Sequence, residues 1–442
     1  MKKYLLITVI LIIILSSMFM VLYTGASQNI PVYSDEFFKI AVTFYGNTST
    51  SRAFSFFTRS HSYENNCYIQ LDPAPYEQQK PKFFDIDNIL IKADSEYTAS
   101  TWPKQLRHKA YVDNLSPATK YFYRVGCKKT NEWSDYGYFV TDDKDSNFCF
   151  LHITDSQGKN QEDFHAFGKS LQKAYEIQSD YDFIVSTGDQ VELGVNARQW
   201  DMYFASAQSF LLQTTFAPVN GNHELVPQPV SNHFYLNLDS KLIEYTFEYG
   251  DAVFVILDSN NSLYDEQIEY LRNVFQNTDK KWKIAAFHYA PFSSGTHADD
   301  KNVLNVKEKI VPVLADCGVD LVLNGHDHIY CRTYPINSEG NIGTWQYAAE
   351  TALDDGGVKY TYTNPQGVFY VINRCVGTKF YSKSNLFNDR FIQKGDSSNF
   401  SKPVFSTVKV SRNSLIYTAY EYDRNNTESV KIWDCFEIIK QS

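Results

Sequence analysis

Five apolar segments of this 442-residue chain each run into a side chain that can bind a metal ion. Carboxylate and amide oxygens, together with imidazole nitrogens, suit hard or borderline ions such as Fe, Mn and Zn. One carboxylate has enough lone pairs to bridge two ions, and the number of ligands fits two ions better than one. We therefore predict a dinuclear metal site. Its candidate ligands are Asp155, Asp189, Asn222, His288, His326 and His328.

These residues are far apart in sequence, so particular elements must bring them together. After about residue 147, apolar strands alternate with helical patterns over 163–178, 265–277 and 303–316, which is typical of an α/β domain. Ligand sites in such sheets gather outside the carboxyl ends of the strands. We therefore expect an α/β domain over 147–442. Strand-like stretches at 367–373, 406–410, 415–420 and 431–439 are expected to complete its second sheet.

The region before this domain has a different pattern. Short strands separated by turn residues run from about residue 31 to 141, which predicts an all-β sandwich over 29–142. The large number of aromatic residues, 32 Tyr and 32 Phe, suits such strands. The segment 115–121 resembles the fibronectin type III corner, in which a Tyr, here Tyr121, bonds back to upstream backbone. Charged residues at 141–146 are expected to form the boundary between the two domains.

The N-terminal residues 1–28 predict export. Lys2 and Lys3 precede an apolar stretch over 4–23, after which residues 24–27 are small or polar. Twenty apolar residues suffice to span a bilayer, so a cleaved signal peptide and a membrane anchor both remain open. We expect the rest of the chain to be extracytoplasmic, either secreted or tethered to the membrane by this segment.

Charge and cysteine content exclude some functional classes. The net charge is -10 and no run is rich in Lys or Arg, so a nucleic-acid partner is not expected. Seven cysteines without a C-x-x-C pair indicate neither a zinc knuckle nor a redox motif. Disulfides between Cys67 and Cys127, or between Cys375 and Cys435, and buried free thiols remain alternatives.

The order D, G-D, G-N-H, H, G-H-x-H resembles the calcineurin-like metallophosphoesterases. The similarity is greatest to the purple acid phosphatase branch, whose last motif, G-H-x-H-x-Y-x-R, matches Gly325 through Arg332. This resemblance implies a fibronectin type III-like N-terminal domain, followed by a catalytic domain with a two-sheet ββ sandwich core flanked by helices. It also assigns the ligands. Asp189 bridges the two ions, Asp155 and His328 bind the first, and Asn222, His288 and His326 bind the second.

The resemblance further implies roles in catalysis. His223 lies beside the phosphate, where it donates a proton to the leaving oxygen or stabilises charge. His297 stands where the family often has another substrate-facing histidine. Arg332 either clamps phosphoryl oxygens or packs at the end of a strand.

The sequence departs from the family pattern at two positions. Glu192 replaces the tyrosine of G-D-x-x-Y, so we expect no tyrosinate colour. Glu192 is then an additional ligand, an acceptor behind the ligands or a solvated loop charge. Gln157 replaces a metal-binding histidine of the wider superfamily, and its carbonyl oxygen is a candidate additional ligand.

Together these features predict metal-assisted hydrolysis of a small phosphorylated substrate. A phosphomonoester is preferred because of the resemblance to acid phosphatases. A phosphodiesterase or nucleotidase activity at the same site is the main alternative. An extracellular binding or adhesion protein with a weak or inactive phosphatase scaffold is the alternative from another class.

Overall fold

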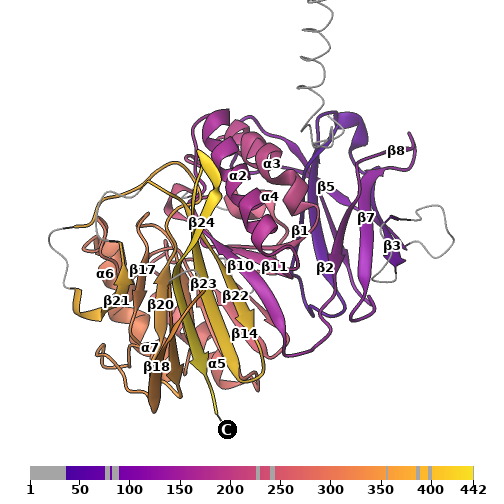
Figure 1. Ribbon diagram of the computed structural model, residues 1–442. Coiled ribbons are helices and arrows are strands. Elements are labelled where there is room, and N and C mark those ends of the chain that lie inside the picture. The colour runs from indigo at the N-terminus through magenta and orange to yellow at the C-terminus, as the bar shows by residue number, and fades with distance from the viewer. Residues whose placement is uncertain are drawn as a thin grey trace, which may run out of the picture.

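The computed structural model describes residues 36–441 except for 75–79, 82–88, 225–228, 239–243, 355–356, 385–388 and 397–400. The predicted targeting segment, residues 1–28, lies outside the described residues. Figure 1 shows a β-rich N-terminal region beside a larger α/β region that contains the rest of the chain. The predicted fold class is confirmed in both regions.

The N-terminal region is a sandwich of two sheets. Its core consists mainly of aromatic and β-branched side chains, including Phe54, Tyr123 and Val125. The Tyr121 hydroxyl accepts a hydrogen bond from the backbone N–H of Ser116 at 2.8 Å, as the corner motif predicts. One layer contains β1 (Phe37–Thr43), β2 (Arg52–Thr58), β5 (Asp94–Tyr97) and β6 (Leu106–Val112); the other contains β3 (Cys67–Ala74), β4 (Ile89–Lys92), β7 (Lys120–Cys127), β8 (Glu132–Trp133) and β9 (Gly137–Val140). A short 3-10 helix, η1 (His61–Tyr63), follows β2.

Two sheets also form the core of the α/β region. The first contains β10 (Phe148–Ile153), β11 (Phe183–Ser186), β12 (Thr215–Pro218), β18 (Tyr347–Ala352), β19 (Val358–Thr363), β22 (Val404–Val410), β23 (Ser414–Asp423) and β24 (Asn426–Ile439). The second contains β13 (Tyr245–Tyr249), β14 (Ala252–Ile256), β15 (Trp282–Ala286), β16 (Leu321–Asn324), β17 (Cys331–Thr333), β20 (Phe369–Ile372) and β21 (Ile392–Gly395). One expectation was wrong: β20 belongs to the second sheet, but β22, β23 and β24 extend the first, because β22 pairs antiparallel with β10.

Helices cover the outer faces of these sheets. Alternate residues of β14 show the layering: Phe254 packs in the core that includes the first sheet, whereas Val253 and Val255 pack with the helices on the opposite face. The predicted helix 303–316 is two helices, because Pro312 cannot continue the backbone hydrogen-bond pattern of the first. The helices are α2 (Gln161–Ile177), α3 (Ala197–Leu211), α4 (Pro229–His233), α5 (Tyr264–Gln276), α6 (Lys301–Lys309) and α7 (Val311–Asp316), with 3-10 turns η2 (Asn222–Glu224) and η3 (Asp389–Phe391).

The two regions share one sheet. Strand β1 pairs parallel with β12, which joins one layer of the N-terminal sandwich to the first α/β sheet in twelve strands. Buried polar contacts support the junction: Lys39 forms an ion pair with Asp201 of α3 at 2.6 Å, and Arg52 Nε donates to Thr215 at 3.1 Å. The N-terminal sandwich is therefore fixed to the α/β region by backbone pairing.

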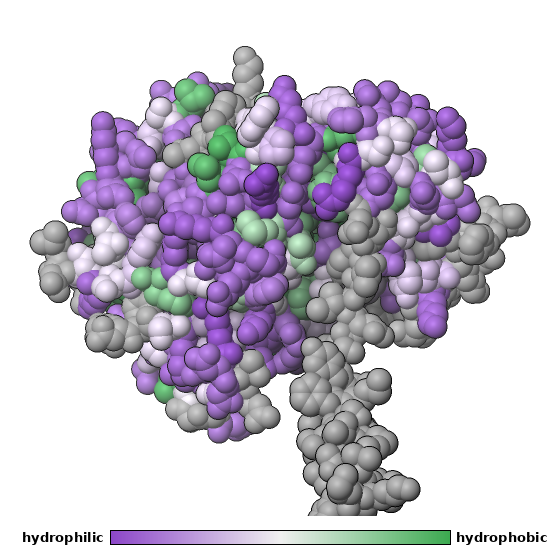
Figure 2. Space-filling model, turned by 90° about the horizontal axis from the view of Figure 1, so that it is seen from above, coloured by the Kyte–Doolittle hydropathy of each residue, from purple (hydrophilic) through white to green (hydrophobic). Residues whose placement is uncertain are grey.

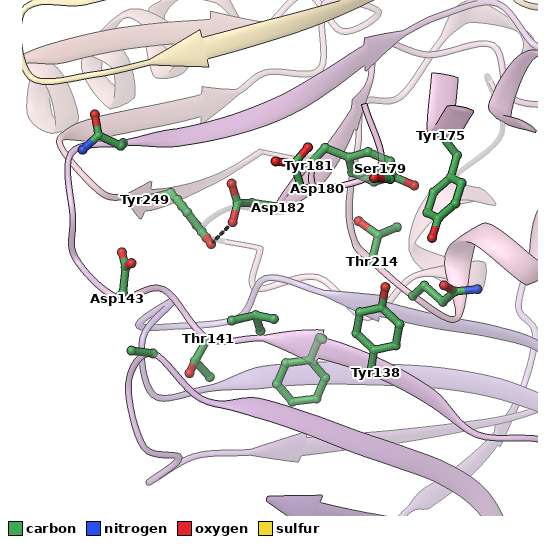
Figure 3. Close-up of a pocket in the computed structure, with 15 residues that line it drawn as sticks. Tyr138, Thr141, Asp143, Tyr175, Ser179, Asp180, Tyr181, Asp182, Thr214 and Tyr249 are labelled. Carbon is green, nitrogen blue, oxygen red and sulfur yellow. Dashed lines mark hydrogen bonds between the residues drawn. The ribbon is translucent and has the colours of Figure 1, made fainter. Parts of the chain in front are cut away.

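A pocket lies at this junction (Figure 3). Tyr138 and Thr141 line it from the N-terminal side, and Tyr181, Asp182 and Tyr249 line it from the α/β side. The Tyr249 hydroxyl donates to Asp182 at 3.1 Å.

The surface is mainly polar on the face that Figure 2 shows, where apolar residues form small separate patches. No helix within the described ranges is long and apolar enough to cross a membrane. All seven cysteines are buried free thiols, so neither predicted disulfide pair is bonded in this structure.

Candidate metal centre

The six predicted ligands converge at the carboxyl ends of strands from both sheets. Asp155 follows β10, Asp189 follows β11, and Asn222 begins η2 after β12, whereas His288 and the His326 to His328 turn follow β15 and β16. Five of the six side chains are at most 8% exposed. The sixth, Asn222, is half-buried, and its Oδ1 lies within hydrogen-bond distance of His288 Nε2. The packing of the two α/β sheets therefore brings the carboxyl ends of their strands together at one site.

Three of these residues have left-handed backbone conformations. Asp155 and Asp189 have φ of 52°, and His326 has φ of 74°. Such angles are strained for residues other than glycine and occur often at functional sites. Glycine is needed beside them: a Cβ on Gly188 would lie 2.5 Å from His288 Nδ1, and one on Gly325 would lie 2.7 Å from Asp155 Oδ2.

One side of the centre pairs Asp155 with His328. His328 Nε2 lies 3.1 Å from Asp155 Oδ1, and its other ring nitrogen, Nδ1, donates to the backbone oxygen of Lys379 at 2.9 Å. A ligating histidine characteristically holds its second nitrogen in this way, which fixes the ring and directs Nε2 at the ion. This geometry fits the first metal position.

The other side groups Asn222 with two histidines. Asn222 Oδ1 lies 3.0 Å from His288 Nε2 and 2.8 Å from His326 Nδ1. His288 Nδ1 donates to the backbone oxygen of Thr187 at 2.8 Å, which directs Nε2 inward. Asp189 lies between the two sides: its Oδ2 is 3.3 Å from His288 Nε2, and ligand atoms of Asp155, Asp189 and His288 all lie within 4.8 Å of one another.

The electrostatics of the site favour bound cations. Burial alone lowers the pKa of His288, but the nearby Asp189 carboxylate outweighs burial and raises it to about 9. Burial likewise opposes protonation of His328, yet Asp155 raises its pKa well above the ordinary value. For Asp189, burial raises the pKa, but the charges of His288 and His223 and their hydrogen bonds together hold it below the usual range. Without metal, protons on these two imidazoles supply the positive charge that ions would otherwise provide.

A buried carboxylate supports the bridging residue from behind. Glu224 accepts hydrogen bonds from the backbone N–H groups of Asp189, Gly221 and Val191 at 2.9 to 3.1 Å. Burial, together with the charge of Asp189, raises the pKa of Glu224 to about 8. Glu224 thus ties the turn after β11 to the turn after β12. The sequence signal for this role is its position directly after G-N-H.

His223 lies at the edge of the centre, with one ring nitrogen held by backbone and the other directed at the bridging carboxylate. Its Nδ1 donates to the backbone oxygen of Glu192 at 2.7 Å, and its Nε2 is directed toward Asp189, 3.9 Å from Oδ2. The Glu192 side chain forms an ion pair with Lys379 and lies 3.7 Å from Lys159. The Glu192 side chain is therefore held by lysines, and its backbone oxygen holds His223; the role of the Glu192 carboxylate stays a prediction.

Gln157 and His297 also reach the centre. Gln157 Nε2 lies 3.4 Å from Asp189 Oδ2, and its Oε1 is buried without a hydrogen-bond partner in the described part of the chain, which suits an additional ligand. The ring of His297 lies 4.7 Å from that of His326, and its Nδ1 is 2.8 Å from Asp300.

Arg332 is buried in the fold and paired with a carboxylate, which favours the packing alternative over the phosphoryl clamp. Its side chain is fully buried and forms a bidentate ion pair with Asp434, at 2.6 and 3.0 Å. Tyr330 donates to the same carboxylate at 2.9 Å. The end of the G-H-x-H-x-Y-x-R motif therefore packs against β24.

The segment 376–381 also borders the centre, although no sequence pattern identified it. The N–H of Gly377 donates to the backbone oxygen of Asp155 at 3.1 Å, and the Tyr381 ring stacks on His328 with 4.3 Å between centroids. Tyr381 also contacts His297, with 5.2 Å between ring centroids. Only the tertiary fold places these side chains beside the ligands.

Comparison with known proteins agrees with this geometry. The model of the calcineurin-like phosphoesterase family matches residues 149–330, and that of the purple acid phosphatase N-terminal domain matches residues 38–141. The chain belongs to the calcineurin-like metallophosphoesterases, with a purple acid phosphatase N-terminal domain. The predicted resemblance is therefore confirmed, and membership of this family implies a site for two metal ions.

The matched relatives are distant. Probable purple acid phosphatase 20 of Arabidopsis thaliana is 28% identical over 35% of this chain and 40% of its own length. Purple acid phosphatase 17 from the same plant is 28% identical over 42% of this chain and 64% of its own length. Probable inactive purple acid phosphatase 1, also from this plant, is 24% identical over 52% of this chain and 44% of its own length. The chain thus spans less than two thirds of the length of each of these relatives.

Solved structures share the fold across most of the chain. A purple acid phosphatase, PPD1, from yellow lupin seeds aligns with a TM-score of 0.72 at 15% identity, covering 93% of this chain and 75% of that one. PhoD aligns with a TM-score of 0.58 at 11% identity, covering 91% of this chain and 93% of that one. At these identities the likeness concerns the fold alone.

Proposed function

We propose that this protein hydrolyses phosphate esters, with phosphomonoesters as the preferred class, at a dinuclear metal centre. The observation that carries the proposal is the convergence of two carboxylates, one amide and three histidines within a few ångströms of one another. Two ions bound there would polarise the phosphoryl oxygens and lower the pKa of bound water.

The donor set fits such ions. The inward nitrogens of His288 and His328 are fixed by backbone acceptors on their other ring nitrogens. No thiolate is present in the set, which favours Fe, Mn or Zn over softer ions. Asp155 with His328 would hold one ion, Asn222 with His288 and His326 the other, and Asp189 would contact both.

His223 is the candidate general acid. Because Nδ1 donates to the Glu192 backbone oxygen, Nε2 is the nitrogen available to hold a proton for the leaving oxygen. The Glu192 carboxylate also lies near this ring, 3.9 Å from Nδ1. His297, whose ring centroid lies 4.7 Å from that of His326, would face the phosphoryl group.

The proposal is tested by turnover of p-nitrophenyl phosphate and bis-p-nitrophenyl phosphate after reconstitution with Fe, Mn or Zn. Faster monoester hydrolysis that disappears in Asp189→Asn is the expected result. A diester preference would move the substrate to the phosphodiesterase class at the same centre. No turnover with any metal, in protein shown to be folded, would contradict a hydrolase.

A binding role remains a second candidate because two matched relatives are named probable inactive purple acid phosphatases. The replacement of the ligand tyrosine by Glu192 is the feature of this chain that favours it. Against it stands the complete set of second-metal ligands. We also propose an extracytoplasmic location, based on the apolar segment 4–23.

A further inference from the structure

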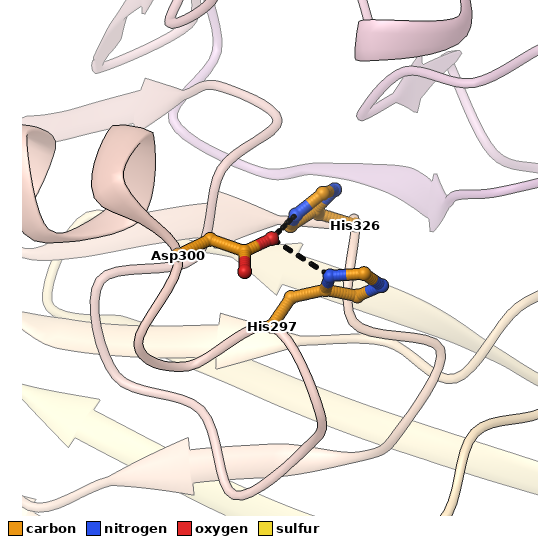
Figure 4. A group of neighbouring side chains, drawn as sticks. All are labelled: His297, Asp300 and His326. Carbon is orange, nitrogen blue, oxygen red and sulfur yellow. Dashed lines mark hydrogen bonds and ion pairs between the residues drawn. The ribbon is translucent and has the colours of Figure 1, made fainter.

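A second group of potential ligands lies on the outer side of the metal centre (Figure 4). His297 and Asp300 come from the loop between β15 and α6, and His326 comes from the turn after β16. Asp300 Oδ2 lies 2.8 Å from His297 Nδ1 and 3.9 Å from His326 Nε2. One ligand atom from each of the three lies within 4.8 Å of the others.

His326 faces two directions at once. Its Nδ1 points inward, 2.8 Å from Asn222 Oδ1, whereas its Nε2 points outward toward Asp300. The residue is only 8% exposed, and Nε2 has no hydrogen-bond partner among the residues that the structure describes. Leaving a buried polar nitrogen without a partner is costly, so an additional group is expected on this side of the ring.

The spacing of the three atoms suits a zinc-sized ion. Around a tetrahedral ion with bonds of about 2.0 to 2.1 Å, neighbouring ligand atoms lie about 3.3 Å apart. The separations of 2.8 and 3.9 Å fall on either side of that value, so small side-chain movements would suffice. The Asp300 side chain is 50% exposed, which leaves room for a water molecule as fourth ligand and a path for entry.

We infer that His297, Asp300 and His326 form a third, outer site for a divalent transition-metal ion such as Zn²⁺. The inference rests on the proposed function only in that His326 is shared with the second inner ion. With the inner ion on Nδ1, the ring proton is on Nε2; an outer ion bound there would release that proton to solvent and leave the ring as an anion shared by the two ions. Because the outer ion also engages His297, excess zinc would withdraw that residue from the substrate and inhibit turnover.

Equilibrium dialysis of the full chain against Zn²⁺, followed by measurement of bound zinc, tests the site. Asp300→Asn removes the charged ligand, and Asp299→Asn, an exposed neighbour outside the group, is the matched control. We expect three ions per chain in the unaltered protein and in Asp299→Asn, but two in Asp300→Asn. Equal zinc content in the unaltered protein and Asp300→Asn would overturn the outer site.

The same experiment distinguishes failure of this inference from failure of the proposed function. Loss of one zinc ion in Asp300→Asn reports on the outer site alone, whatever the turnover. Inhibition of p-nitrophenyl phosphate hydrolysis by excess Zn²⁺ should weaken at least tenfold in Asp300→Asn and remain in Asp299→Asn. Unchanged inhibition in Asp300→Asn would contradict the inference even if hydrolysis itself is established.

Discussion

Two clusters of buried charge in the α/β region differ in how completely their atoms are paired. One cluster lies in the C-terminal part of the chain and is centred on Arg374 and Arg332. Arg374 donates from all three guanidinium nitrogens, to Asp396, Glu421 and the backbone oxygen of Lys402. Arg332 is likewise paired with Asp434. In the metal centre, carboxylates and histidines face one another, and atoms such as Gln157 Oε1 have no partner in the described ranges.

The difference separates a structural cluster from a ligand site. A buried charge that is fully paired needs nothing further, and removing its partner destabilises the fold. A buried group of carboxylates beside histidines whose pKa is raised, such as His288 and His328, can exchange the protons on those rings for metal ions. The two clusters should therefore respond differently to substitution.

Replacement of Arg332 by Met gives the largest expected effect on stability. It leaves Asp434 buried with one hydroxyl donor, Tyr330, so the free energy of unfolding should fall by about 3 to 5 kcal/mol. Urea unfolding measures this change, and Arg332→Lys gives a folded alternative if the Met variant does not express. A tenfold rise in KM at unchanged stability would instead restore a substrate-binding role.

Replacement of Asn222 by Ala should act on activity rather than on the fold. Loss of its Oδ1 removes one ligand from the second metal position, so kcat/KM should fall at least about 100-fold. Unfolding of the metal-free variant should change by only about 1 kcal/mol. Asn273→Ala, on the exposed surface of α5, is the control. Retained activity in Asn222→Ala would favour the binding scaffold.

Metal removal should lower stability mainly through the two inner metal positions. At an ion concentration of 100 times Kd, one bound ion stabilises the folded state by about 2.7 kcal/mol. Thermal unfolding with and without a chelator should therefore show a clear decrease for the unaltered protein and a much smaller one for Asp189→Asn. Equal decreases in both would place the stabilising ions elsewhere.

The smallest expected effect is a pH dependence at the junction pocket. Burial raises the pKa of Asp182 to about 6. A raised pKa means that the folded state binds this proton more tightly than the unfolded state does. The protonated Asp182 carboxyl therefore adds to the free energy of unfolding below about pH 4, and this gain is lost as the pH rises through about 6. Asp182→Asn should remove about 2 kcal/mol of this dependence, measured by urea unfolding at pH 4 and pH 7. An unchanged difference between the two pH values would contradict the raised pKa.

Much of the fold follows from sequence because local signals repeat. Each apolar strand that ends in a ligand type is visible on its own, and parallel topology then brings the strand ends together. The pairing of β1 with β12 and of β22 with β10 is not visible, because strand neighbours depend on tertiary packing rather than on periodicity. This is why the C-terminal strands were expected in the wrong sheet.

The residues of the site also differ in whether a sequence motif predicts them. The candidate ligands carry motif signals, and the structure places them together. Tyr381 and Asp300 carry none, since each reaches the centre from a loop whose position is set by contacts with distant residues. Arg332 is the opposite case, because it belongs to a motif but its side chain pairs with Asp434, more than a hundred positions away in sequence.

Anomalous X-ray diffraction from crystals of zinc-reconstituted protein tests the central claim most directly. We expect two strong inner peaks, one beside Asp155 and His328 and one beside Asn222, His288 and His326, with Asp189 in contact with both, and a third peak at the outer group of His297, Asp300 and His326. No density between these residues at saturating zinc, or peaks only at other side chains, would contradict the assignment of this cluster as the metal centre.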